Sequence, residues 1–253
     1  MFQSKERRRK RIRETLFPEA WEQILRDTTP WYRRLPVEDR EELHGHIHVL
    51  LAEKHFEGAG NIEVTEKMKL IICTHAGLLL LHRETDYFPK LITTLIYPEA
   101  YAVKTRIQTD RGVFSEVIET RAGESWTSGV LILAWEDVER DLASTPATRS
   151  VILHEFAHQL DAGSGVMNGA PVLSDRELRQ HWPEALSDAY ERLSHATRQH
   201  ERTLLRPYGA KNPPEFFAVV TEAFFLYPTE LQRGESDLYS ALCQYFKQDP
   251  ASW

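Results

Sequence analysis

Cysteine is scarce in this chain, and long apolar runs are missing. There are only two cysteines in 253 residues, Cys73 and Cys243, and they lie far apart, so we expect neither a disulfide framework nor a zinc ribbon. No apolar run approaches the length of a membrane span, and the first residues lack the apolar core of a signal peptide. Together with a mean hydropathy of −0.46, these absences predict a cytoplasmic protein.

Two further absences narrow the function. No Gly-x-x-x-x-Gly-Lys-Ser/Thr segment occurs, so a phosphate-binding loop is not predicted. The formal net charge is −7, so the surface as a whole does not favour nucleic acid. The composition is that of an ordinary globular protein, 42% hydrophobic and 27% charged, and the chain is long enough for a full core. We therefore expect a single domain over residues 1–253, with an N-terminal helical region at about residues 1–60.

The stretch that carries most information is His154-Glu-Phe-Ala-His158, within an apolar segment. Residues four apart lie on one face of a helix, so the two imidazoles can aim at one metal ion. Glu155 then flanks the ion and can take a proton from activated water. This pattern predicts a zinc-peptidase helix with His154 and His158 as ligands and Glu155 as the general base.

The flanking sequence favours a buried helix at this place. Residues 147–160 contain no glycine or proline and have a broad apolar surface. Thr145 and Pro146 suggest an N-cap and a first-turn proline, and Gly163 and Gly165 end the helix. The alternative is a chance match, which eleven histidines in a chain of this length would produce in roughly a few chains per hundred. Burial and capping favour the metal site.

The N-terminal part of the chain is expected to be helical. A basic run at residues 4–13 is either a contact for an acidic partner or a solvated helix start, and nearby acidic residues favour the second reading. Helices are predicted to open at Pro18, to run from about Val37 to Phe56, and to follow a cap at Thr65 in a segment buried through residue 81. Three alternating histidines at positions 44, 46 and 48 would scatter around a helix, so no second metal site is expected there.

Residues 91–135 change in character. Three segments, 91–96, 113–118 and 129–134, are rich in β-branched and large apolar residues, which predicts a small sheet of three or four strands. By analogy with zinc peptidases, the strand at 129–135 would pair with an extended substrate; the alternative is one more core strand. Residues 162–172 are expected to form a loop near the metal, and residues 182–200 an amphipathic helix. The fold class is therefore α+β, predominantly helical.

Zinc needs a third protein ligand in a catalytic site. The position six residues after His158 is Ser164, which does not fit, and Asp161 is better placed to orient a histidine. A second apolar helix begins at Asn212 and carries Glu215 and Glu222 on one face. Carboxylates on such a helix are costly unless paired or metal-bound, so both are candidates, with Glu215 preferred.

Several stretches in combination resemble the Mlc titration factor A (MtfA) family, also called the glucose-regulated metallopeptidases. They cover most of the chain and are the following: His154-Glu-Phe-Ala-His-Gln-Leu-Asp161, Asn168-Gly-Ala-Pro171, Tyr208-Gly…Asn212-Pro-Pro-Glu-Phe-Phe-Ala218, the C-terminal residues 237–250 and the buried residues 65–81. The block from Tyr208 to Ala218 is also similar to the catalytic domain of the lethal-factor toxin protease. There the glutamate is the third zinc ligand and the tyrosine assists the transition state, which implies these roles for Glu215 and Tyr208.

The resemblance implies a zincin-like core with a small mixed sheet, Zn²⁺ as cofactor and aminopeptidase-like activity on small peptide substrates. It also implies binding of a transcriptional repressor of sugar uptake. An alternative from another class is a regulatory module that sequesters such a repressor, and a third is a metallohydrolase acting on a non-peptide amide. A purely structural site would not need Glu155, so we favour the peptidase.

Overall fold

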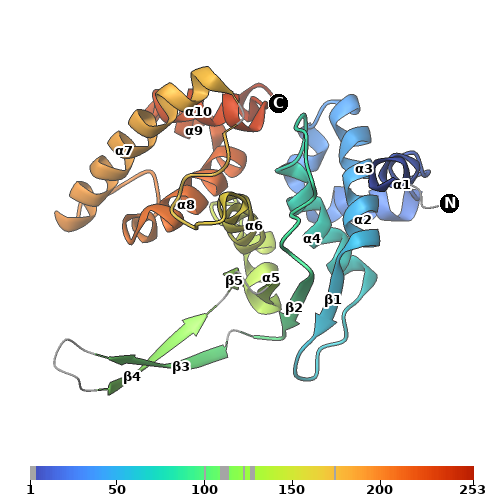
Figure 1. Ribbon diagram of the computed structural model, residues 1–253, viewed down its shortest axis with the longest axis horizontal. Helices are drawn as coiled ribbons and strands as arrows, with labels where there is room; N and C mark the ends of the chain where they lie inside the picture. The colour runs from blue at the N-terminus through green and yellow to red at the C-terminus, as the bar shows by residue number, and fades with distance from the viewer. Residues whose placement is uncertain (1–3, 100, 109–113, 122, 126–128, 174) are drawn as a thin grey trace.

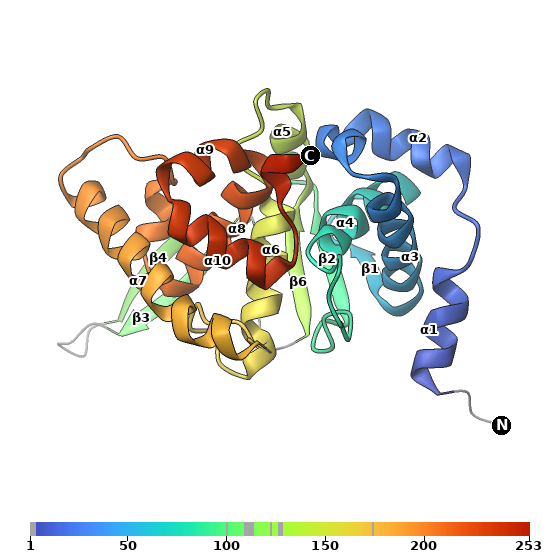
Figure 2. The same ribbon diagram turned by 90° about the horizontal axis from the view of Figure 1, so that it is seen from above.

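The computed structural model describes residues 4–99, 101–108, 114–121, 123–125, 129–173 and 175–253. The element at its centre is helix α6 (Val151–Asp161), which carries His154, Glu155 and His158. In Figures 1 and 2 it lies between the N-terminal helices on one side and the C-terminal helices on the other.

The N-terminal helices form much as the sequence predicts. They are α1 (Lys5–Arg13), α2 (Glu19–Thr28), the 3-10 helix η1 (Pro30–Arg34), α3 (Val37–Glu53) and α4 (Glu66–Leu78). Pro18 is the N-cap of α2, and the Thr65 side chain caps α4 by accepting the N–H of Met68 at 3.2 Å. The prediction for α3 was wrong at its end, because residues 55–58 leave the helix and form a strand.

The basic run forms α1, and one of its arginines is a core residue. Arg9 is 3% exposed and binds both oxygens of Glu53, while Arg7 and Arg11 face solvent. The solvated-helix interpretation therefore holds for the outer face only. The histidines of α3 are scattered as expected: His44 Nε2 meets the Tyr32 hydroxyl at 2.7 Å, and His46 Nδ1 meets the Tyr87 hydroxyl at 2.9 Å.

The strands form two sheets rather than one. The first has the order β1 (His55–Gly58), β2 (Thr93–Tyr97), β6 (Val130–Ala134), β5 (Gly123–Ser125), with β1, β2 and β6 parallel and β5 antiparallel. The second pairs β3 (Tyr101–Gln108) with β4 (Phe114–Arg121), which extends away from the helices (Figure 1). The predicted strand near residues 113–118 therefore belongs to a separate hairpin.

The prediction that the strand at 129–135 pairs with substrate was wrong. Its residues 130–134 form β6, which is hydrogen-bonded to β2 on one side and to β5 on the other, so its backbone has no free edge for a peptide. Within the described residues the edge strands of this sheet are β1 and β5, and β5 lies against α6.

Helix α6 begins later than the sequence suggested. After α5 (Trp135–Ala143) the chain passes through a cis Thr145–Pro146 bond, and the N-cap is Ser150, whose hydroxyl accepts the N–H of Leu153 at 3.2 Å. Thr145 is therefore not the cap. The helix ends as predicted before its glycines, with the 3-10 turn η2 (Ala162–Ser164) and Gly165 at φ +98°.

The C-terminal part supplies the second wall of the site. Its elements are α7 (Arg176–Arg198), η3 (Pro207–Ala210), α8 (Pro213–Leu226), α9 (Pro228–Gly234), α10 (Ser236–Phe246) and η4 (Pro250–Ser252). Helix α8 packs on α6, and η3 packs on α8. One hydrophobic cluster runs through both helical parts. No helix in the described ranges is long and apolar enough to cross a membrane.

Candidate metal centre

Two buried helices and one short turn bring the predicted site residues together. His154, Glu155 and His158 come from α6, Glu215 from the first turn of α8, and Tyr208 from η3. The three α6 residues are buried, with exposures of 8%, 4% and 7% in chain order. Polar side chains at this depth are costly unless they have partners.

The start of α8 is set by its own sequence. The Asn212 side chain accepts the N–H of Glu215 at 3.0 Å, and Pro213 and Pro214 occupy first-turn positions where no N–H is needed. Glu215 is therefore held at a helix N-terminus, which stabilises a carboxylate, and its side chain points toward α6.

The ligand atoms of three residues converge on one point. Glu215 Oε2 lies 3.0 Å from His154 Nε2 and 3.4 Å from His158 Nε2. His154, His158 and Glu215 each offer a ligand atom within 4.8 Å of the other two, and they are the one such group among the residues that the structure describes.

These separations fit a tetrahedral zinc site. Bonds of about 2.0–2.1 Å to zinc place neighbouring ligands about 3.3 Å apart, close to both carboxylate–imidazole distances. Two imidazoles and one carboxylate are also the donor set of many catalytic zinc sites, in which a fourth position is left for water or substrate. The residues present therefore fit the ion that the sequence predicted.

The charges at the site favour a cation. Burial disfavours a charged His154, but hydrogen bonds to Glu215 and Glu222 outweigh burial and raise the pKa of His154 to about 10. Burial also opposes a charged Glu215, yet the two histidines dominate and lower its pKa well below the usual range. The two carboxylates thus stabilise positive charge at His154, and a divalent ion bound there would replace the Nε2 proton.

Glu155 lies beside the ligands without being one of the three. It is 4% exposed, and its Oε2 has no hydrogen-bond partner among the described residues. Burial raises the pKa of its carboxyl group. A carboxylate with a raised pKa and a free oxygen is suited to accept and return a proton.

Tyr208 is at the mouth of the site. The residue is 47% exposed, and its hydroxyl donates to Glu215 Oε1 at 3.0 Å. Burial of the hydroxyl and the nearby Glu215 raise the pKa of the phenol, so it stays a hydrogen-bond donor at neutral pH. Lys211 lies next to it, with Nζ 3.9 Å from Glu215 Oε1.

Glu222 lies behind His154, away from the convergence point. It is fully buried, and its Oε1 accepts from His154 Nδ1 at 2.8 Å. Because Nδ1 is on the other side of the imidazole ring from Nε2, Glu222 does not belong to the ligand group. Of the two carboxylates that the sequence left open, the structure brings Glu215 to the other ligands.

The predicted role of Asp161 was wrong. Its Oδ2 accepts the backbone N–H of Gly169 at 2.7 Å and so secures the loop that follows α6. Both ring nitrogens of His154 meet other carboxylates, and His158 Nδ1 has no hydrogen-bond partner in the described part of the chain. Asp161 therefore holds the loop, and it is Glu222 that orients a histidine.

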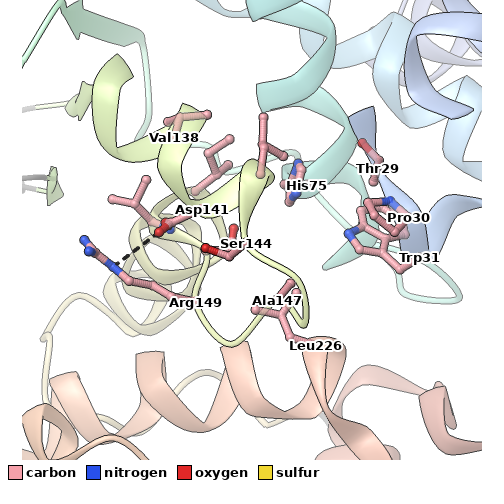
Figure 3. A pocket seen from close by; sticks show the side chains of 14 residues that line it. Thr29, Pro30, Trp31, His75, Val138, Asp141, Ser144, Ala147, Arg149 and Leu226 are labelled. Carbon is pink, nitrogen blue, oxygen red and sulfur yellow. Dashed lines mark hydrogen bonds and ion pairs between the residues drawn. The ribbon is translucent and has the colours of Figure 1, made fainter. Parts of the chain in front are cut away.

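A separate pocket lies at the start of α6 (Figure 3). Trp31 and His75 line one side, and Asp141 and Arg149 the other, with Arg149 Nε 3.8 Å from Asp141. The cavity measures about 30 Å³, which is room for one or two waters rather than for a peptide. Asp141 also accepts the N–H of Val151 at 2.7 Å, so this pocket supports the helix start and is not the substrate site.

Comparison with known proteins agrees with this geometry. A family model described as glucose-regulated metallo-peptidase M90 matches residues 3–247. The chain belongs to this family. An uncharacterised protein of Synechocystis sp. is 39% identical to this M90 protein over 244 residues, which cover 96% of this chain and 89% of the relative.

Mlc titration factor A of Yersinia pestis is 28% identical over 206 residues, which cover 79% of this chain and 74% of the relative. The protein of the same name from Yersinia pseudotuberculosis matches to the same extent. The resemblance to the Mlc titration factor A family is thus confirmed, and membership of a metallopeptidase family implies a metal.

The ion pair between Arg206 and Glu222 escaped the sequence analysis. Nothing in the sequence around Arg206 indicates that it pairs with Glu222, because an arginine before a Pro-Tyr-Gly turn is common. The cost of burying Glu222 was visible on its apolar helix, but its partner was not.

Proposed function

We propose that this protein is a zinc-dependent peptidase with aminopeptidase-like activity, and that the fold is a zincin-like core in a single domain. The observation that supports it best is the convergence of His154, His158 and Glu215 beside Glu155. A site that only had to hold a metal for structure would not need a buried carboxylate with a free oxygen.

The residues of the chain divide the chemistry among them. His154, His158 and Glu215 would hold the ion, which when bound polarises the peptide carbonyl and lowers the pKa of water toward about 7. Glu155 takes a proton from the attacking water and delivers it to the leaving amine. Tyr208, whose hydroxyl donates to Glu215 Oε1 in this structure, would turn to donate to the oxygen on which negative charge develops.

The edge strand β5 suggests how a peptide substrate is aligned. β5 pairs with β6 on one side and lies against α6, and no strand pairs with its other side among the described residues. An extended peptide that adds to this edge would lie alongside the metal centre, with main-chain hydrogen bonds that do not depend on its sequence. We therefore transfer to β5 the substrate-pairing role first expected for residues 129–135.

Glu155→Gln tests the peptidase directly. The variant should retain zinc and lose at least about a thousandfold in turnover of short peptides, because the amide cannot accept the proton. The measurement is cleavage of a peptide library by the zinc-loaded proteins, with a chelator-treated sample as control. Full turnover in the variant, or in the chelated wild type, would remove this function.

A regulatory function is the second candidate, because the Yersinia relatives are named Mlc titration factor A. Here the protein would bind a transcriptional repressor, with or without peptidase activity. A pull-down with an Mlc-like repressor, using zinc-loaded and chelated protein, separates the two: retention without peptide cleavage favours sequestration. We place the protein in the cytoplasm, in keeping with its two free cysteines.

A further inference from the structure

The fully buried carboxylate of Glu222 joins three parts of the metal centre. Its Oε1 accepts from His154 Nδ1 at 2.8 Å and forms an ion pair with Arg206, and its Oε2 accepts the N–H of Ser150 at 2.7 Å. The side chain is 0% exposed, so each of these contacts is shielded from water. Removing the carboxylate would leave several buried donors without an acceptor.

The contact with His154 determines which ring nitrogen serves the metal. A carboxylate can only accept, so Nδ1 carries a proton, and Nε2, which meets the Glu215 carboxylate, is the nitrogen left to give up its proton and offer a lone pair when an ion binds. The same bond fixes the rotation of the ring about its side chain. Nε2 then points toward Glu215 Oε2 at 3.0 Å, which is the position that the ligand set requires.

Arg206 connects this carboxylate to the turn that carries Tyr208. Its side chain is 29% exposed and pairs with Glu222, while the next residue, Pro207, begins η3. The ion pair therefore anchors the chain two residues before Tyr208 to the middle of α8. An Arg–carboxylate pair with one partner buried is geometrically restrictive, so it limits how far the phenol can move.

We propose that Glu222 and Arg206 are positioning residues of the metal centre, which hold the His154 tautomer and the Tyr208 turn from one buried ion pair. Neither touches the reacting atoms. The proposal deepens the proposed peptidase function and rests on it. The competing view is that Glu222 only stabilises the fold by capping Ser150 and neutralising Arg206.

Zinc affinity separates these views without using catalysis. The test compares E222Q and R206Q with D137N, which makes the same carboxylate-to-amide change at a buried aspartate that pairs with Arg140 and Arg149 and lies outside the ligand group. Zinc dissociation constants come from chelator competition at one pH. The absorption spectrum of the cobalt-substituted proteins reports the geometry of the ligands.

We expect E222Q to bind zinc about 10- to 100-fold more weakly and to shift the cobalt spectrum, because the histidine loses its charged partner. D137N should change the affinity less than threefold. R206Q should weaken zinc binding by about fivefold and lower kcat, and the loss in kcat should shrink in a Y208F background, since both changes act through one hydroxyl.

Equal zinc affinities and cobalt spectra for wild type, E222Q and D137N would overturn the proposal. If E222Q does not fold, R206Q decides, because its side chain is partly exposed: zinc affinity and kcat within twofold of wild type would also overturn it. A wild-type protein that binds zinc, shows these affinity differences and cleaves no peptide would remove the peptidase function only. A wild-type protein that retains no zinc would remove both.

Discussion

Two arginines that form ion pairs can be compared: Arg9, which is buried near the N-terminus, and Arg206, which is partly exposed at the metal centre. Arg9 binds Glu53 through two nitrogens, at 3.0 and 2.7 Å, donates to Asp86 at 2.6 Å and lies over the Tyr87 ring at 4.6 Å. Arg206 pairs with one carboxylate, which also serves a histidine. The hydrogen bonds of Arg9 are satisfied within its own cluster, whereas the carboxylate that pairs with Arg206 is shared with a histidine.

The difference lies in the balance of charge and hydrogen bonds. Around Arg9, the guanidinium nitrogens donate to the carboxylates of Glu53 and Asp86. At the metal centre two carboxylates, Glu215 and Glu222, share His154, and Glu155 Oε2 has no partner among the described residues. Native structures rarely leave buried polar atoms unpaired, so incomplete pairing at this depth points to function. Complete pairing, as around Arg9, points to a role in the stability of the fold.

Among variants that test this comparison, the largest effect, on zinc affinity, is expected at Glu215. Glu215→Ala removes one of three ligands and should weaken zinc binding by about a thousandfold, while circular dichroism still shows the folded state. Chelator competition measures the affinity, and the exposed Glu184 on α7, changed to alanine, is the matched control. Loss of less affinity than in Glu222→Ala would reverse the assignments of the two carboxylates.

Arg9 should show the opposite behaviour. Arg9→Met leaves Glu53 without its buried partner and should lower the free energy of unfolding by about 3 kcal/mol, with zinc affinity of the folded protein unchanged. Arg11→Met on the exposed face of α1 should cost under about 0.5 kcal/mol. Urea titration measures both. The comparison breaks down if Arg9→Met weakens zinc binding or if the two variants are equally stable.

Tyr208 tests the open side of the metal centre. Tyr208→Phe removes one hydrogen-bond donor and should lower kcat by about a hundredfold, with zinc affinity and stability nearly unchanged. Tyr239→Phe is the control, because that hydroxyl donates to Asp249 at 2.5 Å and not to the turn that carries Tyr208. Steady-state kinetics on one peptide decides, and an unchanged kcat in Tyr208→Phe would exclude a role in the transition state.

The effect that is smallest per step of the titration concerns pH and the N-terminal half. Burial lowers the pKa of His75 from 6.5 to about 4, so the unfolded chain takes up a proton first on acidification. His75 should therefore remove up to about 1.4 kcal/mol of stability per pH unit between pH 6.5 and 4. Urea titrations of wild type and His75→Gln at pH 7, 5.5 and 4 measure this, and a constant difference between them would contradict it.

Much of the local structure followed from the sequence. Threonine at 65 and asparagine at 212 marked helix starts, because their side chains cap backbone N–H groups three residues on, and proline at 18 marked a third start through its fixed backbone angle. The spacing of His154 and His158 predicted the shared helical face, since a helix repeats every 3.6 residues. These features depend only on neighbours in the chain.

Tertiary structure alone decided which distant groups meet. The partner of Arg9 is 44 residues away, and the carboxylate that orients His154 is 68 residues away, distances over which no periodicity carries information. The sequence favoured Glu215 as the ligand, but the role of Glu222 was beyond it, because that role depends on Glu222 meeting Nδ1 of the same imidazole whose Nε2 meets Glu215. The local sequence determined the helices and the kinds of side chain that can bind a metal. The packing of α8 against α6 determined that Glu215 lies at Nε2 of His154 and Glu222 at Nδ1.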